Sequence, residues 1–215
     1  MSHPTESPRG EARPAGDARV RAAAPSDARA LAALMATIYA EGRWFVGDMG
    51  PRAETLARQL RAMDPAREIV LVAEERASDA AGDLVGWIEA RRYLPTRLEH
   101  VASLTIAVAP HARGRGIGRR LMRAVVPWAC RVGVSKLRLD VRAGNEAALA
   151  LYRGEGYVVE GVERDQIRDA DWFEDNVVMA RFLDPCREVD GDRDADRDAD
   201  LDPGAAGDAG ADPGR

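Results

Sequence analysis

The sequence has few of the residues from which metal and disulfide sites are built. Of its 215 residues only two are cysteine, Cys130 and Cys186, and three are histidine. Two cysteines cannot form a disulfide framework, and no CxxC pair or His/Cys cluster has the spacing of a metal site. We therefore expect no metal, and no cysteine nucleophile, because neither cysteine has an implied histidine partner.

Long hydrophobic runs are also absent. No window reaches the roughly 18 apolar residues that a membrane-spanning helix needs. Residues 1–19 are rich in Pro, Arg, Gly and acids and lack the apolar core of a secretory signal. These two absences favour a cytoplasmic protein that has no membrane partner.

Charge is distributed unevenly along the chain. The formal net charge is −5, but residues 184–215 carry eleven acids and four arginines, a net of −7. Residues 1–19 balance three acids against three arginines, so residues 20–183 have a net charge of +2. This small positive charge argues against a nucleic-acid partner.

Composition divides the chain into three parts. We expect a disordered N-terminal arm over residues 1–19, one folded domain over residues 20–183 and a disordered acidic low-complexity tail over residues 184–215. The Asp-x-Asp rhythm of the tail fails as a calcium loop. Arg197 and Pro203 stand where that loop needs Gly and Glu.

Hydrophobic periodicity within residues 20–183 predicts a mixed α/β domain. The expected strands cover residues 20–24, 69–73, 84–93, 101–108, 136–141, 157–168 and 172–182. The expected helices run through residues 31–38, after an N-cap at Ser26 or Asp27, and over 52–63, 117–131 and 145–153. Pro127 lies inside the third of these helices and is expected to kink it.

The most informative segment is RGRGIG, residues 113–118, which follows a predicted strand and opens a predicted helix. Its three glycines leave backbone N–H groups free to approach an anion, and the helix dipole adds about 0.3–1 kcal/mol at an exposed site. Four arginines at positions 113, 115, 119 and 120 surround it, so a diphosphate is the expected ligand. The segment lacks the lysine of a Walker P-loop, and Arg119 replaces the third glycine of a dinucleotide-binding fingerprint.

Further motifs follow this turn in a fixed order. Arg113, Gly116 and Gly118 fit the pattern [Q/R]xxGx[G/A], and Asn145, Leu151-Tyr152 and Gly156-Tyr157 come one strand later. Over about residues 20–183 this order resembles the GNAT superfamily of N-acetyltransferases. The resemblance implies an α/β fold with a mixed, mostly antiparallel central sheet flanked by helices, in which a splayed strand pair holds acyl-CoA.

The implied activity is transfer of the acetyl group from acetyl-CoA, as co-substrate, directly to a primary amine, without an acyl-enzyme. In the family, the strand before the turn hydrogen-bonds the pantetheine arm, the turn holds the pyrophosphate, and an asparagine lies near the cofactor. The matching residues are Ile106, Ala107, Val108, Arg113, Gly114, Arg115, Gly116, Ile117, Gly118, Arg119 and Asn145. Asn145 is also typical of a helix N-cap, and the two roles are compatible.

Two residues are the candidate catalytic groups. Tyr152 matches the family tyrosine that protonates the departing thiolate; a core position in its helix is the other interpretation. The ordinary pKa of a thiol, about 8.5, and of a phenol, about 10, are close enough for such a donor. Asp140 lies where ribosomal-protein alanine N-acetyltransferases of this superfamily carry an acidic candidate base. His100 and a chain of waters are open alternatives.

The acceptor site is expected between the loop joining the first two helices and the last hairpin. The aromatic and acidic residues in these two places are Trp44, Phe45, Asp48, Trp172 and Phe173. The expected partner is an amine acceptor, either a small molecule or a protein or peptide, and a homodimer is left open. The alternative function is a non-catalytic acyl-CoA-binding module.

Overall fold

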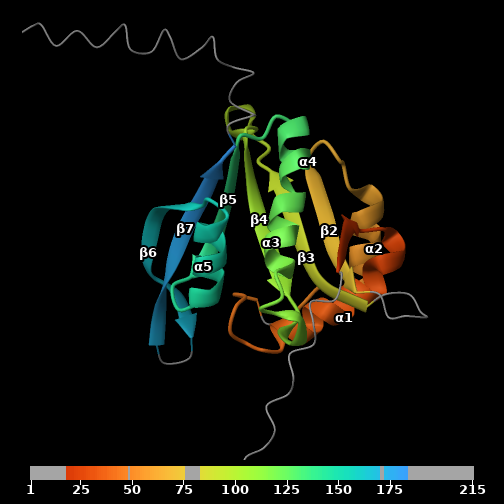
Figure 1. The fold of residues 1–215 in the computed structure, drawn as a ribbon, viewed down its shortest axis with the longest axis horizontal. Coiled ribbons are helices and arrows are strands. Elements are labelled where there is room, and N and C mark those ends of the chain that lie inside the picture. Colours follow the sequence, from red (N-terminus) through yellow and green to blue (C-terminus); the bar gives the residue numbers. More distant parts are fainter. Residues whose placement is uncertain (1–17, 48, 76–82, 170–171, 184–215) are drawn as a thin grey trace, which may run out of the picture.

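A seven-stranded sheet organises the protein. The computed structural model describes residues 18–47, 49–75, 83–169 and 172–183 (Figure 1). Its strands lie in the order β1-β2-β3-β4-β5-β7-β6, and all neighbours are antiparallel except β4 and β5. The strands are β1 (Arg19–Ala22), β2 (Glu68–Glu75), β3 (Asp83–Arg92), β4 (Val101–Val108), β5 (Lys136–Arg142), β6 (Val158–Asp169) and β7 (Trp172–Phe182). The predicted mixed, mostly antiparallel sheet is confirmed.

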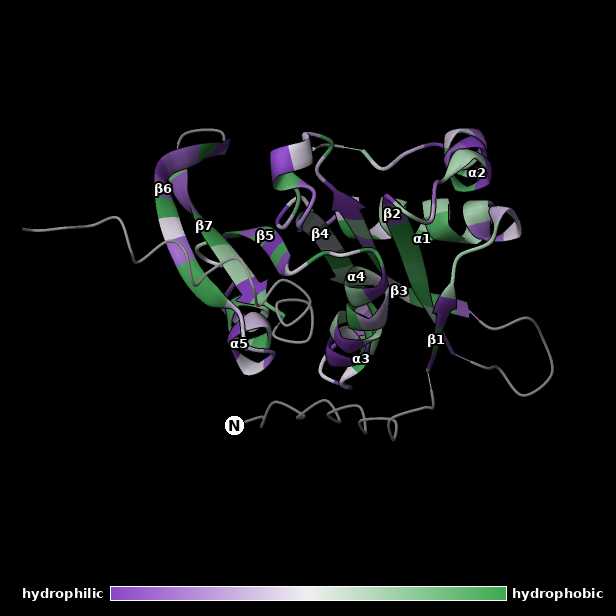
Figure 2. Ribbon diagram, turned by 90° about the horizontal axis from the view of Figure 1, so that it is seen from above, coloured by the Kyte–Doolittle hydropathy of each residue, from purple (hydrophilic) through white to green (hydrophobic). Residues whose placement is uncertain are grey.

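Helices cover both faces of this sheet. The helices are α1 (Ala28–Tyr39), α2 (Ala53–Ala62), α3 (Ile117–Ala124), α4 (Val126–Arg131) and α5 (Glu146–Gly154). Figure 2 shows α1 and α2 on one face and α3 and α5 on the other, with hydrophobic strands between them. No helix in the described ranges is both long and apolar enough to cross a membrane.

Two neighbouring residues of β3 show which face each strand position occupies. A Cβ atom added to Gly86 would lie 3.2 Å from Cδ1 of Leu121 in α3. The ring of Trp87 instead stacks on Phe45, with centroids 6.0 Å apart, and Phe45 stacks on Tyr39 at the end of α1, at 4.6 Å. Because side chains alternate along a strand, odd-numbered residues of β3 from 87 onward face α1 and even-numbered residues face α3.

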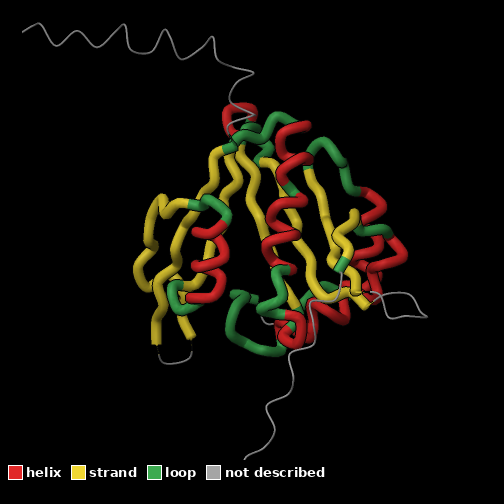
Figure 3. The backbone as a smooth tube through the Cα atoms, in the orientation of Figure 1, coloured by secondary structure: helices red, strands yellow, loops and turns green. Residues whose placement is uncertain are grey.

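Strands β4 and β5 separate soon after they meet. They pair in parallel at three positions, from Val101 opposite Lys136 to Ser103 opposite Arg138. Beyond Ser103 the β5-facing edge of β4 has no register with β5, while its other edge stays paired with β3 as far as Val108 opposite Gly86. The two strands diverge toward the end of the sheet at which α3 begins (Figure 3).

The single helix expected over residues 117–131 is wrong. The structure has two helices there, α3 and α4, with Val125 between them. Proline at 127 has no N–H to donate within a continuous helix, and it occupies the first turn of α4, where that N–H is not needed. The proline therefore starts a new helix instead of bending one.

Asp27, one of the two expected N-cap residues, occupies the N-cap position of α1, but it does not make the expected side-chain bond. Residues Pro25–Asp27 form a short 3-10 turn before α1, and the Asp27 side chain makes no capping bond to that helix. The Asp27 carboxylate instead accepts hydrogen bonds from the Arg21 guanidinium at 2.7 and 2.9 Å and from the Ala24 N–H at 2.7 Å. Asp27 thus joins β1 to the start of α1.

Asp27→Asn should destabilise the protein by about 1–2 kcal/mol at pH 7, because it removes charged hydrogen bonds. The bonds from Arg21, and less strongly the bond from Ala24, hold the pKa of Asp27 below its usual 3.8, against the opposing effect of burial. A lowered pKa gives stability that is complete above 3.8 and is lost as the pH falls through the folded-state pKa. Urea unfolding of wild type and variant should therefore converge in acid.

Asp83→Asn, at the exposed start of β3, is the matched control and should change stability little at either pH. A constant difference between Asp27→Asn and wild type from neutral to acidic pH would contradict the role assigned to the Asp27 carboxylate.

Candidate functional site

The separation of β4 from β5 leaves backbone hydrogen-bonding groups available along one strand edge. Ile106, Ala107 and Val108 pair with β3 on one side, and on the other side none of the described strands pairs with them. Unpaired groups on a strand edge can bind another extended chain. The Val108 carbonyl accepts a hydrogen bond from Nε of Arg113 at 3.0 Å, so one arginine side chain returns to this edge.

The glycine turn beyond β4 provides a second set of free groups. Gly114 and Gly116 both have φ of 75°, a left-handed conformation that favours glycine, and Gly116 is the N-cap of α3. A Cβ atom at either position would meet no atom within 4 Å. The N–H groups of residues 114–117 donate to no other group among the described residues. This turn can bind an anion through its backbone at the positive end of α3.

The arginines of the turn already have acidic partners. Arg113 binds Glu41 through both terminal nitrogens, at 2.5 and 2.8 Å, and holds the pKa of that carboxyl below its usual range. Arg115 lies 2.8 Å from Glu75. Arg119 lies 3.0 Å from Glu155, and Arg120 also has a partner. The donors of the turn without a partner among the described residues are therefore its backbone N–H groups and the buried Nε of Arg115.

Helix α5 lies against α3 on the same face of the sheet. A Cβ atom at Gly118 would come within 2.9 Å of Cδ2 of Leu151, so the helices touch where α3 begins. Oδ1 of Asn145 accepts from the Ala148 N–H at 3.1 Å, which confirms Asn145 as the N-cap of α5. Tyr152 is buried beside the ring of Tyr157, and its hydroxyl has no hydrogen-bond partner among the described residues. Burial raises the pKa of Tyr152 to about 12.

Asp140 lies on the opposite face of the sheet from Tyr152's helix. Ser103 of β4 pairs with Arg138 of β5, and the next residues on that face are Thr105 and Asp140. Both oxygens of Asp140 accept from Arg138, at 2.9 and 3.0 Å, and Asn176 approaches one of them at 3.4 Å. The predicted acid and base thus lie on opposite faces of the sheet, and Asp140 lies beside the gap that opens where β4 and β5 stop pairing.

His100 lies elsewhere. It precedes the paired part of β4, and its carbonyl accepts from the N–H groups of Ser135 and Lys136 at 2.9 and 3.0 Å. The side chain therefore belongs to the end of the sheet where β4 and β5 are still joined, away from the gap.

The expected acceptor residues divide into packed and exposed groups. Phe45 packs on Trp87, and Nε1 of Trp44 donates to Glu41 at 3.1 Å, so the loop after α1 is attached both to the sheet and to the partner of Arg113. Trp172 and Phe173 are 52% and 57% exposed at the start of β7. Asp48 lies outside the described residues.

One acidic residue near the gap was missed by sequence reasoning. Glu89 lies two residues after Trp87 on β3, so it faces α1, and its Cα partner on β4 is Thr105. It is partly buried, and this burial raises the pKa of its carboxyl. The sequence did contain a sign of this residue, because Glu89 is the one charged residue in the run Val85–Ala90. The other residues of that run are buried.

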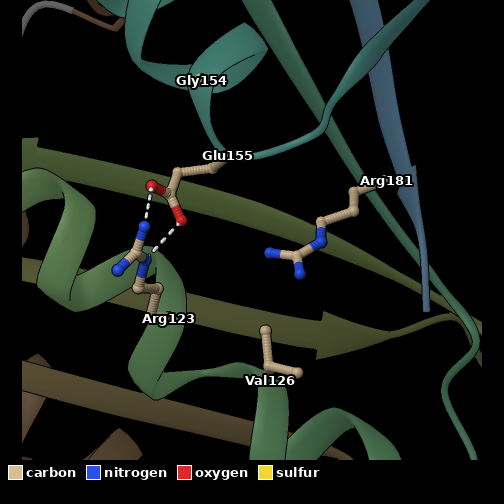
Figure 4. Close-up of a pocket in the computed structure, with 5 residues that line it drawn as sticks. All are labelled: Arg123, Val126, Gly154, Glu155 and Arg181. Atoms are coloured by element: carbon tan, nitrogen blue, oxygen red, sulfur yellow. Dashed lines mark hydrogen bonds and ion pairs between the residues drawn. The ribbon is translucent and has the colours of Figure 1, made fainter. Parts of the chain in front are cut away.

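Figure 4 shows a pocket at the C-terminal ends of α3 and α5. It is lined by Arg123, Val126, Gly154, Glu155 and Arg181. Glu155 is buried and accepts from Arg123 at 2.9 and 3.1 Å, in addition to its ion pair with Arg119. This network fixes α5 to α3, and the pocket contains none of the predicted site residues. Over the described ranges, no three His, Cys, Asp or Glu side chains are grouped to hold a metal.

Comparison with known proteins identifies relatives of this arrangement. The model of the acetyltransferase (GNAT) family matches residues 35–157. The N-alpha-acetyltransferase RimI of Mycobacterium tuberculosis is 43% identical over 89 residues, which are 41% of this chain and 54% of the relative. The [ribosomal protein bS18]-alanine N-acetyltransferase of Escherichia coli K12 is 35% identical over 83 residues, 39% of this chain and 56% of the relative. The chain thus spans about half the length of these curated relatives.

A solved structure extends the likeness over the whole folded region. The ribosomal-protein-alanine N-acetyltransferase of Brucella melitensis superposes with a TM-score of 0.68 and 26% identity, covering 77% of this chain and 99% of that one.

The two left-handed glycines Gly116 and Gly133 offer a matched test of the turn. Both have φ near 75°, at 75° and 77°, and both have open space around the added Cβ. Alanine at either position should cost about 1–2 kcal/mol of stability, because a side chain disfavours this conformation. Only Gly116→Ala should also weaken binding of a diphosphate-bearing ligand, measured by calorimetric titration with coenzyme A. Equal affinities in the two variants would show that the turn does not hold the diphosphate.

Proposed function

The chain belongs to the GNAT family of acetyltransferases, and from this premise we propose that it transfers an acetyl group from acetyl-CoA to a primary amine. The observation that carries the proposal is the edge of β4 that β5 leaves unpaired, followed, after a short 3-10 helix at Pro110–Ala112, by a turn whose N–H groups have no described partner. An extended amide-bearing arm followed by a diphosphate would match these two sets of groups in order. Bound there, acetyl-CoA supplies the acetyl thioester.

The residues for holding acetyl-CoA are assigned by this match. Ile106, Ala107 and Val108 would hydrogen-bond the pantetheine arm through the backbone edge that β5 leaves free. The N–H groups from Gly114 to Gly118 would bind the diphosphate. Arg113, Arg115 and Arg119 would assist it with guanidinium N–H groups while their carboxylate partners hold them in place. Asn145 would hold the start of α5 near the ligand.

Tyr152 is proposed to act on the leaving sulfur as a hydrogen-bond donor. The pKa of Tyr152 is about 12, whereas an ordinary phenol has a pKa of about 10 and a thiol about 8.5. Complete transfer of the Tyr152 proton to the thiolate is therefore uphill. A protonated hydroxyl without a protein partner can still stabilise negative charge that develops on sulfur. Burial therefore changes the expected role from proton transfer toward electrostatic stabilisation.

The acceptor amine is proposed to reach the gap from the α1 face, where Asp140 lies. A primary amine that arrives as an ammonium has no lone pair, so it must lose a proton before it attacks the thioester. Asp140 is one candidate to receive this proton, although Arg138 engages both of its oxygens. The exposed Trp172 and Phe173 and the loop after α1 would border the entrance for either a small-molecule or a peptide amine.

Purified protein should bind acetyl-CoA and release free thiol when it is given a suitable amine. The measurement is thiol release over a panel of amino acids, peptides with an N-terminal alanine, polyamines and aminoglycosides, with calorimetric binding of acetyl-CoA alongside. Binding without thiol release for any amine would favour the non-catalytic acyl-CoA-binding module. Absence of acetyl-CoA binding would refute the proposal.

Tyr152→Phe should lower kcat on the order of 100-fold, because it removes the donor to the leaving sulfur, while acetyl-CoA affinity stays unchanged. Tyr157→Phe is the matched control, since the Tyr157 hydroxyl is buried without a hydrogen-bond partner among the described residues. Equal turnover in the two variants would remove Tyr152 from the mechanism.

A further inference from the structure

We infer that Glu89 binds the ammonium group of the acceptor and takes its proton. This inference rests on the proposed acetyl transfer and adds to it the residue that prepares the amine. Its basis is the placement, on the acceptor side of the gap between β4 and β5, of a carboxylate that makes no hydrogen bond or ion pair within the described part of the chain.

The sheet register places Glu89 at the level of the gap. Glu89 of β3 is the Cα partner of Thr105 of β4. Thr105 is two residues beyond Ser103, the last position of β4 paired with β5, and Asp140 is two residues beyond Arg138. Glu89, Thr105 and Asp140 therefore lie in one row across three strands, on the face toward α1. A directly opposite strand neighbour is about 5 Å away, a distance that a glutamate side chain and a bound ammonium can span.

The two carboxylates of this row differ in their partners. Asp140 has both oxygens occupied by Arg138 and is 44% exposed. Glu89 makes no hydrogen bond and no ion pair with any residue that the structure describes. The nearest cation, Arg91, is bound to Glu68 and makes no ion pair with Glu89, so this partly buried carboxylate is the better site for an incoming ammonium.

The groups around Glu89 suit a primary ammonium. Tyr39 lies near enough to interact electrostatically with it, and Trp87 is on the same face of β3. Aromatic rings attract cations, so these side chains would add to the attraction of the carboxylate. The nearest charged neighbours are Arg91 on the same strand and Glu68 on β2, which bind one another at 2.9 Å.

The proton and electrons balance without another reactant. The ammonium N–H proton passes to a Glu89 oxygen, which leaves a neutral amine and a neutral carboxylic acid. The nitrogen lone pair forms the new amide bond to the acetyl carbon as the carbon–sulfur bond breaks. The electron pair of the broken carbon–sulfur bond stays on sulfur, which leaves as a thiolate near Tyr152. Of the two remaining protons, the second amine proton and the one on Glu89, one neutralises the thiolate and the other passes to solvent. Burial favours this step, because it raises the pKa of the Glu89 carboxyl toward that of the amine.

Glu89→Gln should lower kcat/KM at pH 7 by about 100-fold or more, with acetyl-CoA affinity unchanged. The probes are a short peptide with an N-terminal alanine and spermidine, and each rate is followed from pH 6 to pH 10. The difference in kcat/KM between Glu89→Gln and wild type should become smaller as the pH approaches the pKa of the amine, because the amine then arrives without its extra proton. Glu89→Asp should recover part of the activity. Glu68→Gln, which removes a neighbouring carboxylate already bound to Arg91, should stay close to wild type.

Two results would overturn the inference while leaving acetyl transfer intact. One is wild-type kcat/KM in Glu89→Gln at pH 7, and the other is a deficit of equal size at every pH, which indicates a structural role. Failure of the wild-type protein to bind acetyl-CoA would instead overturn the proposed function.

A binding measurement tests whether Glu89 binds an ammonium even if neither probe is acetylated. The carboxyl carbon of Glu89 is identified by NMR as the signal lost in Glu89→Gln. It should shift when n-butylammonium is added at pH 7 and should not shift with n-butanol, which has the same chain length and no charge. No response to n-butylammonium would refute ammonium binding by Glu89.

Discussion

The divergence of β4 from β5 after three paired positions is the constraint on which the site depends. Backbone groups along a strand must find partners, and beyond Ser103 one edge of β4 has none from β5. The same divergence separates two groups of side chains. The glycine turn and Tyr152 lie with α3 and α5 on one face, whereas Glu89, Thr105 and Asp140 face α1 on the other. Under the proposed function, the two reactants would therefore approach from opposite faces of the sheet.

The sequence was most informative where a structure depends on neighbouring residues. The glycine turn before α3 and the Asn145 cap follow from local chemistry, and the structure has both where the pattern places them. Alternating and continuous apolar runs likewise predicted the strands to within a few residues. Pro127 was identified as an interruption, but the sequence did not predict that it begins a new helix, nor that Trp128 beside it donates to the Pro65 carbonyl. That contact joins segments far apart in the chain.

What the sequence could not predict was the pairing of charges. Glu41, Glu75 and Glu155 each bind an arginine of the turn from a different part of the chain, at separations that no local pattern encodes. The role of Glu89 was hidden for a related reason. Its importance depends on its face of the sheet, its level relative to the gap and the absence of a described partner, and each of these needs the strand register. Asp140 was selected by resemblance, which carries no information about Arg138 beside it.

The double contact made by Arg113 has a consequence for the order in which reactants enter. Its guanidinium holds the Val108 carbonyl and the Glu41 carboxylate at once, and Glu41 in turn accepts from Trp44 in the loop after α1. A ligand that hydrogen-bonds the end of β4 competes with the first of these contacts, so its arrival alters how firmly that loop is held. Under the proposed function, a ligand on β4 would thereby affect the loop that borders the acceptor entrance, which favours ordered rather than random addition of the two reactants.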